Sequence, residues 1–163
     1  MQDIQIRGYY PGVVGKITDL HAVYYYENWG FDVTFETQVG KELSEFVRQF
    51  DKNRDGLWVA VQKGEFAGAI AIDGTQAFDE GARLRWFIVA PQFQRAGIGK
   101  NLILRAIDFC KGRRYHKVCL WTFKGLENAR RLYEAAGFRL CEENGVEQWG
   151  QIIREQKYEL VLG

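Results

Sequence analysis

Several residue types that build common functional sites are scarce in this chain of 163 residues. It has two histidines and three cysteines, and they are not spaced as the paired ligands of a metal site. Its formal net charge is +1 and its 22 basic residues are scattered, so the charge does not favour binding to nucleic acid or an anionic membrane. No long apolar run is present, and residues 1–10 lack the charged and apolar regions of a secretory signal. We therefore expect neither secretion nor membrane insertion.

The three cysteines are Cys110, Cys119 and Cys141, an odd number at wide spacings among apolar residues. This pattern indicates buried, reduced thiols in a cytoplasmic protein. With only His21 and His116 available, no Ser-His or Cys-His pair can be recognised from the sequence. Covalent catalysis through a side-chain nucleophile is therefore not expected, and neither histidine is assigned a role.

The remaining composition, 47% hydrophobic and 26% charged, suits one globular domain over residues 1–163. Apolar periodicity and turn residues predict a strand, two helices, three strands, a helix, a strand, a helix and two strands. Thr34 is placed to cap the second helix. The approximate bounds are 4–6, 13–28, 35–50, 57–61, 67–72, 83–89, 98–112, 118–121, 126–136, 138–141 and 149–161. We expect an α/β fold with a mixed sheet of about seven strands and helices on both faces.

The segment from Arg83 to Phe109 combines a strand, a glycine turn and a helix. Strict alternation along residues 83–89 would place the even-numbered residues on one face and the odd-numbered residues, Arg85 among them, on the other. After Pro91, the stretch Gln94–Lys100 (Q-R-A-G-I-G-K) opens the helix. The first turn of a helix has backbone N–H groups without partners, and glycine lets a phosphate approach them. We therefore interpret this turn as a pyrophosphate site.

Two well-known classes of glycine loop do not match this turn. The dinucleotide fingerprint requires a third glycine where this chain has Leu102, and no GxxxxGK[ST] loop is present. The remaining pattern, V-x-P followed by Q-x-x-G-x-G, resembles the GNAT superfamily of acyl-CoA-dependent N-acetyltransferases. A second stretch at residues 129–138, A-R-R-L-Y-E-A-A-G-F, is similar to the late A-x-x-L-Y-x-x-x-G-F motif of that superfamily. At the level of motifs, the resemblance covers about residues 83–142.

The resemblance implies a GNAT-like, mostly antiparallel sheet whose fourth and fifth strands splay apart to admit the cofactor. It implies an N-acetyltransferase that moves an acetyl group from acetyl-CoA to a primary amine by direct attack, without a metal. Tyr133 would be the general acid toward the departing thiolate. The implied cofactor-binding residues are Phe87, Ile88, Val89, Gln94, Arg95, Ala96, Gly97, Ile98, Gly99 and Lys100. Backbone N–H groups of the first three would also stabilise the developing oxyanion.

The acceptor is expected to be a small-molecule, amino-acid or peptide amine. The break between the first two helices is rich in aromatic and acidic residues, and in the superfamily this region walls the acceptor site. Glu27 and Glu36 flank the break and are candidate general bases. Tyr25 and Trp29 are candidate substrate contacts. Arg85 could pair with a carboxylate or phosphate of the substrate, or form a structural ion pair with an acid from the first helices.

A non-catalytic CoA-binding or regulatory module is the alternative function. Superfamily members often carry an asparagine seven residues before the tyrosine, where this chain has Leu126, and Asn128 lies on a different helix face from Tyr133. Similar domains also occur fused to MarR-type transcriptional regulators, although no DNA-binding domain is recognised here. The retained Tyr133 favours catalysis. Dimers are common in the superfamily, so a homodimer is a further alternative to a monomer.

Overall fold

The computed structural model describes residues 3–94 and 96–163. Its seven strands form one sheet in the order β1-β2-β3-β4-β5-β7-β6, and all neighbours pair antiparallel except β4 and β5, which are parallel. The strands are β1 (Ile4–Arg7), β2 (Gly56–Gln62), β3 (Glu65–Asp73), β4 (Ala82–Val89), β5 (Lys117–Phe123), β6 (Arg139–Gln148) and β7 (Gln151–Val161). The helices are α1 (Val13–Trp29), α2 (Val33–Arg48), α3 (Ile98–Gly112) and α4 (Glu127–Ala135), with a 3-10 turn, η1, at Pro91–Phe93. The predicted order of elements is confirmed.

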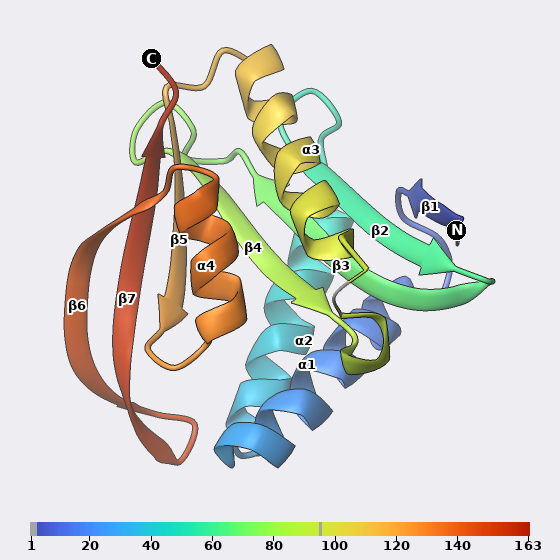
Figure 1. Cartoon of the computed structure of the whole chain (residues 1–163), viewed down its shortest axis with the longest axis vertical. Coiled ribbons are helices and arrows are strands. Elements are labelled where there is room, and N and C mark those ends of the chain that lie inside the picture. The colour runs from blue at the N-terminus through green and yellow to red at the C-terminus, as the bar shows by residue number, and fades with distance from the viewer. Residues whose placement is uncertain (1–2, 95) are drawn as a thin grey trace.

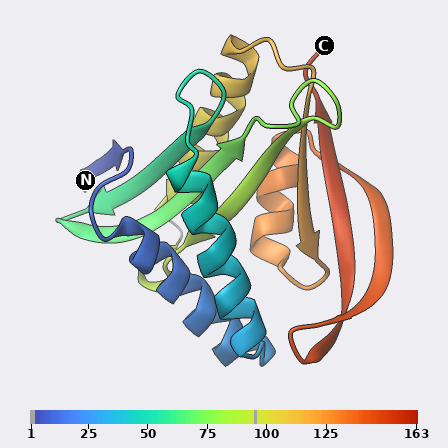
Figure 2. The same ribbon diagram turned by 180° about the vertical axis from the view of Figure 1, so that it is seen from behind.

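The helices form two layers on opposite faces of the sheet. Figure 1 shows α3 and α4 in front of it, and Figure 2, from behind, shows α1 and α2 across the other face. Under α3, buried residues such as Leu102 and Ala106 pack against β3. On the opposite face, Ile17 of α1 and Leu43 of α2 pack against β2 and β3. The α/β architecture with helices on both faces, expected from the sequence, is therefore confirmed.

An aromatic cluster joins the end of α1 and the start of α2 to the hairpin of β6 and β7. Phe31 lies within 5.0–5.2 Å of the rings of Phe35, Phe123 and Trp149, measured between centroids. The backbone N–H of Asp32 donates to the carbonyl of Trp149, which fixes the hairpin against the helices. The aromatic residues of the helix break thus pack together at the end of the sheet where β5 finishes.

Three further features can be compared with the sequence predictions. Asp32, and not Thr34, caps α2, because its carboxylate accepts a hydrogen bond of 2.9 Å from the backbone N–H of Thr34. Cys110 and Cys119 are buried as expected, but Cys141 is exposed, since it lies on the edge strand β6. Within the described residues, no helix is long and apolar enough to cross a bilayer.

The parallel pair at the centre of the sheet separates soon after it begins. β4 and β5 are paired only at Ala82 with Val118 and at Arg83 with Cys119 among the described residues. Beyond these positions β4 continues for six residues and β5 for four without pairing to each other. The predicted splay between the fourth and fifth strands is therefore confirmed, and it opens the sheet at the carboxyl ends of both strands.

A β-bulge interrupts β4 at the start of the splay. Ala71 lies opposite Arg85 and Ala69 lies opposite Ile88, so three steps along β4 match two along β3. Within the bulge Trp86 has a φ of 48°, which bulky residues rarely adopt. The prediction of strict alternation along 83–89 is therefore wrong. Arg85 faces α2, whereas Phe87 faces α4, so the bulge places these two residues of β4 on opposite sides of the sheet.

Candidate active site

The glycine turn leaves backbone donors without partners at the start of α3. Gly97 precedes the helix with a φ of 79°, a conformation that favours glycine, and the first helical hydrogen bond runs from Asn101 N–H to its carbonyl. The N–H groups of Ile98, Gly99 and Lys100 have no acceptor among the described residues. A Cβ on Gly97 would meet no atom within 4 Å, so the space outside the turn is open. This geometry suits a phosphate group.

Close packing fixes the position of this turn. A Cβ on Gly99 would lie 2.9 Å from Leu132 Cδ1 and 3.3 Å from Phe87 Cζ, so glycine lets α3 approach both α4 and β4. Gln94 Nε2 donates a hydrogen bond of 3.3 Å to the carbonyl of Val89, which ties the turn to the end of β4. Of the other residues predicted here, Ala96 and Lys100 are exposed, while Arg95 lies outside the described residues.

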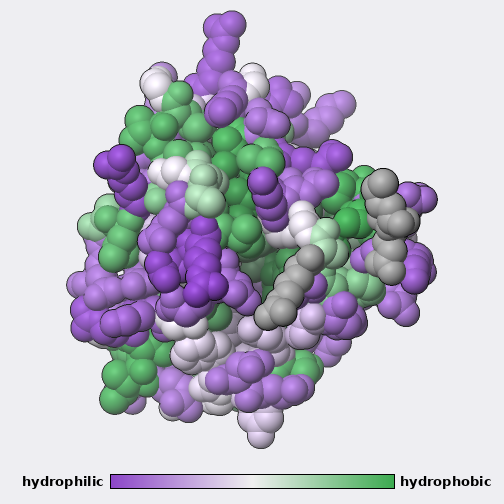
Figure 3. Space-filling view, in the orientation of Figure 1, coloured by the Kyte–Doolittle hydropathy of each residue, from purple (hydrophilic) through white to green (hydrophobic). Residues whose placement is uncertain are grey.

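A cavity of about 630 Å³ lies beside the turn. Four elements line it: the end of β4, the residues before α3, the start of α4 and the end of α1. Its lining residues are Tyr24, Tyr25, Asn28, Trp29, Phe87, Ile88, Val89, Phe93, Gln94, Gly99, Gly125, Leu126, Glu127, Asn128, Ala129, Arg131 and Leu132. Figure 3 shows the surface hollowed between α3 and α4. We call this space the turn cavity.

A second cavity of about 350 Å³ opens on the α1 and α2 side, and we call it the aromatic cavity. Its walls include the side chains of Phe35, Trp86, Trp121, Phe123 and Trp149. The two cavities share four lining residues, Tyr25, Phe87, Leu126 and Ala129. They therefore meet in the gap between β4 and β5, so that molecules bound on opposite faces of the sheet could touch.

Tyr133 of α4 lies where the aromatic cavity reaches this gap. The residue is only 5% exposed and its ring packs against Phe87, Phe138 and Tyr158. Its hydroxyl has no hydrogen-bond partner among the described residues. Burial, with smaller contributions from Tyr25 and Tyr158, raises the pKa of Tyr133 above its ordinary value. The phenol therefore remains protonated at neutral pH and has a proton to donate.

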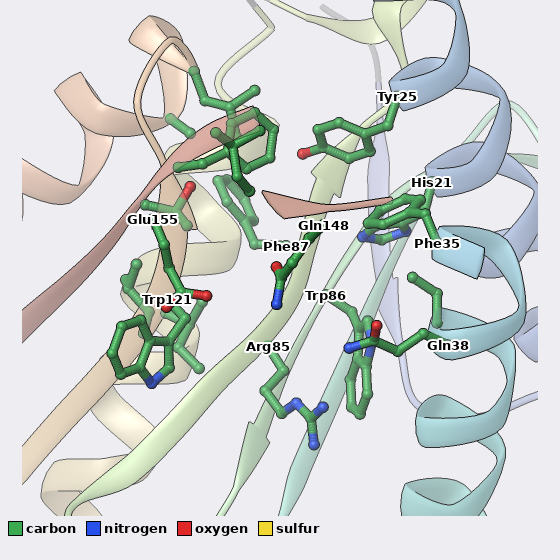
Figure 4. A pocket seen from close by; sticks show the side chains of 18 of the residues that line it. His21, Tyr25, Phe35, Gln38, Arg85, Trp86, Phe87, Trp121, Gln148 and Glu155 are labelled. Carbon is green, nitrogen blue, oxygen red and sulfur yellow. The ribbon is translucent and has the colours of Figure 1, made fainter. Parts of the chain in front are cut away.

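Tyr25 of α1 lies at the junction of the two cavities, and Trp29 of the same helix lines the turn cavity. The ring of Tyr25 stacks on Phe31 at 5.8 Å between centroids, and its hydroxyl points into the aromatic cavity (Figure 4). Burial raises the pKa of Tyr25, so this group is also protonated at neutral pH. Trp29 packs edge-on against Phe123 and closes the turn cavity beside Gly125. Both predicted contact residues are thus brought to the site.

The two predicted bases are not brought to the site. Glu27 and Glu36 are exposed, and neither is among the described residues that line the two cavities. Two other groups that can accept a proton do line the aromatic cavity, His21 on α1 and Glu155 on β7. Glu155 is half-buried, and its carboxylate has no hydrogen bond or ion pair among the described residues. Figure 4 shows its carboxylate at the cavity wall.

His21 is a buried histidine in the wall of the same cavity. Its Nδ1 lies 2.8 Å from the carbonyl of Ile17, which makes Nδ1 the protonated nitrogen and leaves Nε2 as an acceptor. Burial lowers the pKa of His21 to about 4, so the ring is neutral at physiological pH. Its spacing of four residues from Tyr25 places both on one helix face. That spacing is the signal in the sequence that could have indicated His21.

Arg85 is held by neighbouring acids. Its guanidinium pairs with Glu42 of α2, lies 3.6 Å from a carboxylate oxygen of Asp73, and covers the ring of Trp86 at 4.1 Å from the centroid. Of the two alternatives open from the sequence, the structure contains the ion pair with an acid from the first helices. Arg85 still lines the aromatic cavity, but its charge is already compensated.

A sheet that splays beside a helix start suited to an anion, with a cavity on each face, is the arrangement that the resemblance to acyl-CoA-dependent N-acetyltransferases implies. Comparison with known proteins agrees. The family model of the acetyltransferase (GNAT) family matches residues 16–138, and the chain belongs to this family.

Curated relatives and solved structures extend this result. An uncharacterised N-acetyltransferase of Methanocaldococcus jannaschii is 28% identical over 144 residues, and the camello protein of Xenopus tropicalis is 32% identical over 83 residues. The matches span 85% and 51% of this chain, but 62% and 38% of those relatives. A Salmonella typhimurium protein solved with its cofactor acetyl-CoA has a TM-score of 0.78 at 16% identity, covering 98% of this chain and 94% of its own. A Staphylococcus aureus acetyltransferase of the GNAT family has a TM-score of 0.79 at 17% identity, covering 99% and 100%. These structures share the fold.

Proposed function

We propose that this protein transfers an acetyl group from acetyl-CoA to a primary amine by direct attack. The observation that carries the proposal is the meeting of the two cavities in the gap between β4 and β5. One cavity adjoins a helix start whose N–H groups suit an anion, and the other is walled largely by aromatic side chains. Such a pair of cavities lets two substrates enter from opposite faces of the sheet and react where they touch.

The described residues fit acetyl-CoA as the donor. The unpartnered N–H groups of residues 98–100 would bind the pyrophosphate, and the open space beside Gly97 would hold it. The turn cavity, which runs from there to Phe87, would take the pantetheine arm. When bound, acetyl-CoA supplies an acetyl group activated as a thioester.

The end of β4 would stabilise negative charge on the thioester oxygen. Ala90 N–H donates to the carbonyl of Ala67 on β3 at 2.8 Å. Because successive N–H groups of a strand alternate in direction, the N–H of Val89 points away from β3 and toward the gap. Among the three predicted residues, Val89 is therefore the one whose donor we place toward the oxyanion.

Tyr133 and Glu155 would handle the protons. Transfer forms a bond between the amine nitrogen and the carbonyl carbon and breaks the bond from that carbon to sulfur. Glu155 would accept the proton that the amine loses, and Tyr133 would donate one to the departing thiolate. Tyr133 has a raised pKa, but a thiolate formed in the same apolar surroundings is also poorly solvated, which raises its own affinity for a proton.

Two measurements, made one after the other, test the proposal. The first is the melting temperature with acetyl-CoA, CoA, ATP or NAD at matched concentrations, where we expect stabilisation by the two CoA compounds alone. The second is thiol release from acetyl-CoA with a panel of primary amines. Release that depends on the amine supports the enzyme. Stabilisation by CoA without release from any amine would favour the non-catalytic module, and equal stabilisation by ATP would contradict the cofactor assignment.

A further inference from the structure

The mouth of the aromatic cavity contains an arginine that has no direct ion-pair partner among the described residues. Arg83 lies two residues before Arg85 on β4 and lines the same cavity. Arg85 is held by Glu42 and Asp73, but the guanidinium of Arg83 makes no hydrogen bond and no ion pair among the described residues. Partial burial, together with the positive charge of Arg85, lowers the pKa of Arg83, and the nearby carboxylates of Glu42 and Asp73 oppose this shift. An anion bound beside Arg83 would compensate for the lost solvation of its guanidinium and for the repulsion from Arg85.

The neighbouring strands offer no spare acid to Arg83. On the adjoining part of β5 and β7, Glu159 is shared by two lysines, 3.1 Å from Lys117 Nζ and 3.6 Å from Lys157 Nζ. Lys157 also lies 5.6 Å from the centre of the Trp121 ring, another residue of the cavity wall. The acids near Arg83 are therefore already engaged by other cations, and this end of the cavity favours an anionic ligand.

The inner end of the same cavity has the opposite character. Among the described residues, the carboxylate of Glu155 has no partner, and the buried Oε1 of Gln148 has no hydrogen-bond partner. Figure 4 shows the Gln148 side chain projecting into the cavity, with Glu155 on one side and Tyr25 above. Both groups accept hydrogen bonds, so both suit an amine. The cavity thus has acceptors near the gap and a cation at its mouth.

The separation of the two ends limits the length of the acceptor. The cavities meet at Phe87, four residues along β4 from Arg83. Because the bulge matches three steps along β4 to two along β3, these four positions cover about three regular strand steps, roughly 10 Å at about 3.3 Å per residue. The long arginine side chain covers part of that distance. An amine whose carboxylate is several bonds away spans the remaining distance more fully than an α-amino acid, whose amine and carboxylate are attached to one carbon.

We propose that the acceptor is an amine with a carboxylate several bonds away, such as an ω-amino acid, a free lysine or a short peptide. The carboxylate binds Arg83 at the mouth, and the amine lies between Glu155, Gln148 and the gap. The carbon chain between them contacts the aromatic walls. This inference rests on the proposed acetyl transfer and adds the substrate class of the same site.

Four acceptors of defined length and charge test the inference through thiol release from acetyl-CoA. We expect kcat/KM for 6-aminohexanoate to exceed that for hexylamine, 1,6-diaminohexane and glycine by about tenfold or more, as a charge-assisted contact implies. Most of the difference should lie in KM, because the carboxylate is bound equally before and during the reaction. Equal values for 6-aminohexanoate and hexylamine would overturn the inference.

Two substitutions test whether Arg83 binds the carboxylate of the acceptor. Arg83→Gln should reduce the preference for 6-aminohexanoate over hexylamine to near unity, and Arg83→Glu should shift the preference to 1,6-diaminohexane. Lys117→Gln is the matched control, because it removes a cation from the same face that does not line the cavity. An unchanged preference in Arg83→Gln would assign the carboxylate to another residue and refute the proposal.

The outcomes also separate this inference from the proposed function. If acetyl-CoA stabilises the fold and simple amines release thiol with no preference for a carboxylate, the substrate class is wrong and the acetyl transfer stands. If acetyl-CoA stabilises the fold and none of the four compounds reacts, the inference also fails. If acetyl-CoA does not stabilise the fold at all, the proposed function itself is contradicted.

Discussion

At the scale of single residues, the hydroxyl of Tyr133 is the group whose removal would change chemistry with the least change in structure. It donates no hydrogen bond within the described residues, so the fold does not depend on it. We predict that Tyr133→Phe lowers kcat by about 10²-fold, the lower end for loss of a general acid, and leaves the affinity for acetyl-CoA unchanged. Single-turnover thiol release and titration of the melting temperature with acetyl-CoA would measure the two effects.

Tyr158→Phe provides the control for this prediction. Tyr158 is a buried tyrosine that packs against Tyr133 at 6.1 Å between ring centroids but lines neither cavity. The same atom is removed in both variants, and we expect activity to be retained in Tyr158→Phe. A similar loss in both would indicate a packing effect and would count against the role of Tyr133 as acid.

For His21 we predict an effect of pH on the stability of the fold. Its pKa in the folded protein is about 4, compared with 6.5 for an ordinary histidine, because burial disfavours the charged form. Above pH 6.5 both states are neutral at this residue. Between pH 6.5 and 4 the unfolded chain binds a proton that the folded chain does not, so stability falls as the pH falls. From pH 7 to pH 5 this costs about 2 kcal/mol of unfolding free energy.

Denaturant unfolding at pH 7 and pH 5 would measure this contribution. His21→Gln keeps a donor for the carbonyl of Ile17 but does not titrate, so its loss of stability between the two pH values should be smaller by about 2 kcal/mol. The exposed His116, replaced by Gln, serves as the comparison and should behave like the unchanged protein. If His21→Gln lost as much stability as the unchanged protein, His21 would not be a neutral buried residue.

At the scale of elements, two glycines respond in opposite ways to the same added methyl group. Gly40 lies inside α2, where a Cβ would make an ordinary contact of 3.5 Å with Thr18 Cγ2. Gly125 has a φ of 118°, and a Cβ there would lie 2.2 Å from Trp29 Cη2. We predict that Gly40→Ala stabilises the protein by about 0.5–1 kcal/mol, since alanine favours helix. Gly125→Ala should destabilise it by about 1–3 kcal/mol through strain and overpacking.

Thermal unfolding of the two variants checks this pair directly. For a chain of this size, 1 kcal/mol corresponds to about 2–4 °C in Tm. Gly40→Ala should therefore melt slightly higher than the unchanged protein, and Gly125→Ala several degrees lower. A neutral Gly125→Ala would mean that Trp29 can move away from the loop before α4, and that the wall of the turn cavity is not rigid.

The difference between local structure and strand pairing explains which parts of the site could be predicted from the sequence. The glycine turn and the α4 motif are contiguous, and the helix start that makes Gly97–Lys100 an anion site is a local structure. The bulge at Trp86 is not local, because it depends on how β4 pairs with β3. The prediction of strict alternation is therefore wrong at the bulge, because it placed Arg85 and Phe87 on one face.

Residues from the end of the chain were missed for a related reason. Glu155 reaches the aromatic cavity because β7 pairs with β5 and sets it opposite Phe123, and Gln148 is held next to the hairpin turn of β6 and β7. Neither lies in a motif with a recognisable spacing. Glu27 and Glu36, by contrast, were chosen for their position near the helix break, yet the break turns its aromatic side chains inward and leaves these acids exposed.

At the scale of the whole molecule, the sheet consists of two parts that are paired at two positions only among the described residues. One part contains β1 to β4 with α1, α2 and α3, and the other contains β5 to β7 with α4 (Figure 1). The turn cavity is lined from both parts. A ligand that fills it would therefore join them, and binding to the folded state alone stabilises that state by about 2.7 kcal/mol at a ligand concentration of 100 times Kd.

Hydrogen exchange can locate this stabilisation within the molecule. With acetyl-CoA bound, we predict slower exchange of the amides of Ile98, Gly99 and Lys100, which lack acceptors among the described residues, and of Val89 at the end of β4. These amides gain direct partners, whereas β1 and the outer part of β2 lie far from the turn cavity and should change only as global stability changes. Uniform protection of all amides would indicate that the ligand stabilises the fold without using the turn. Protection confined to β6 and β7 would place the ligand elsewhere and would contradict the CoA site.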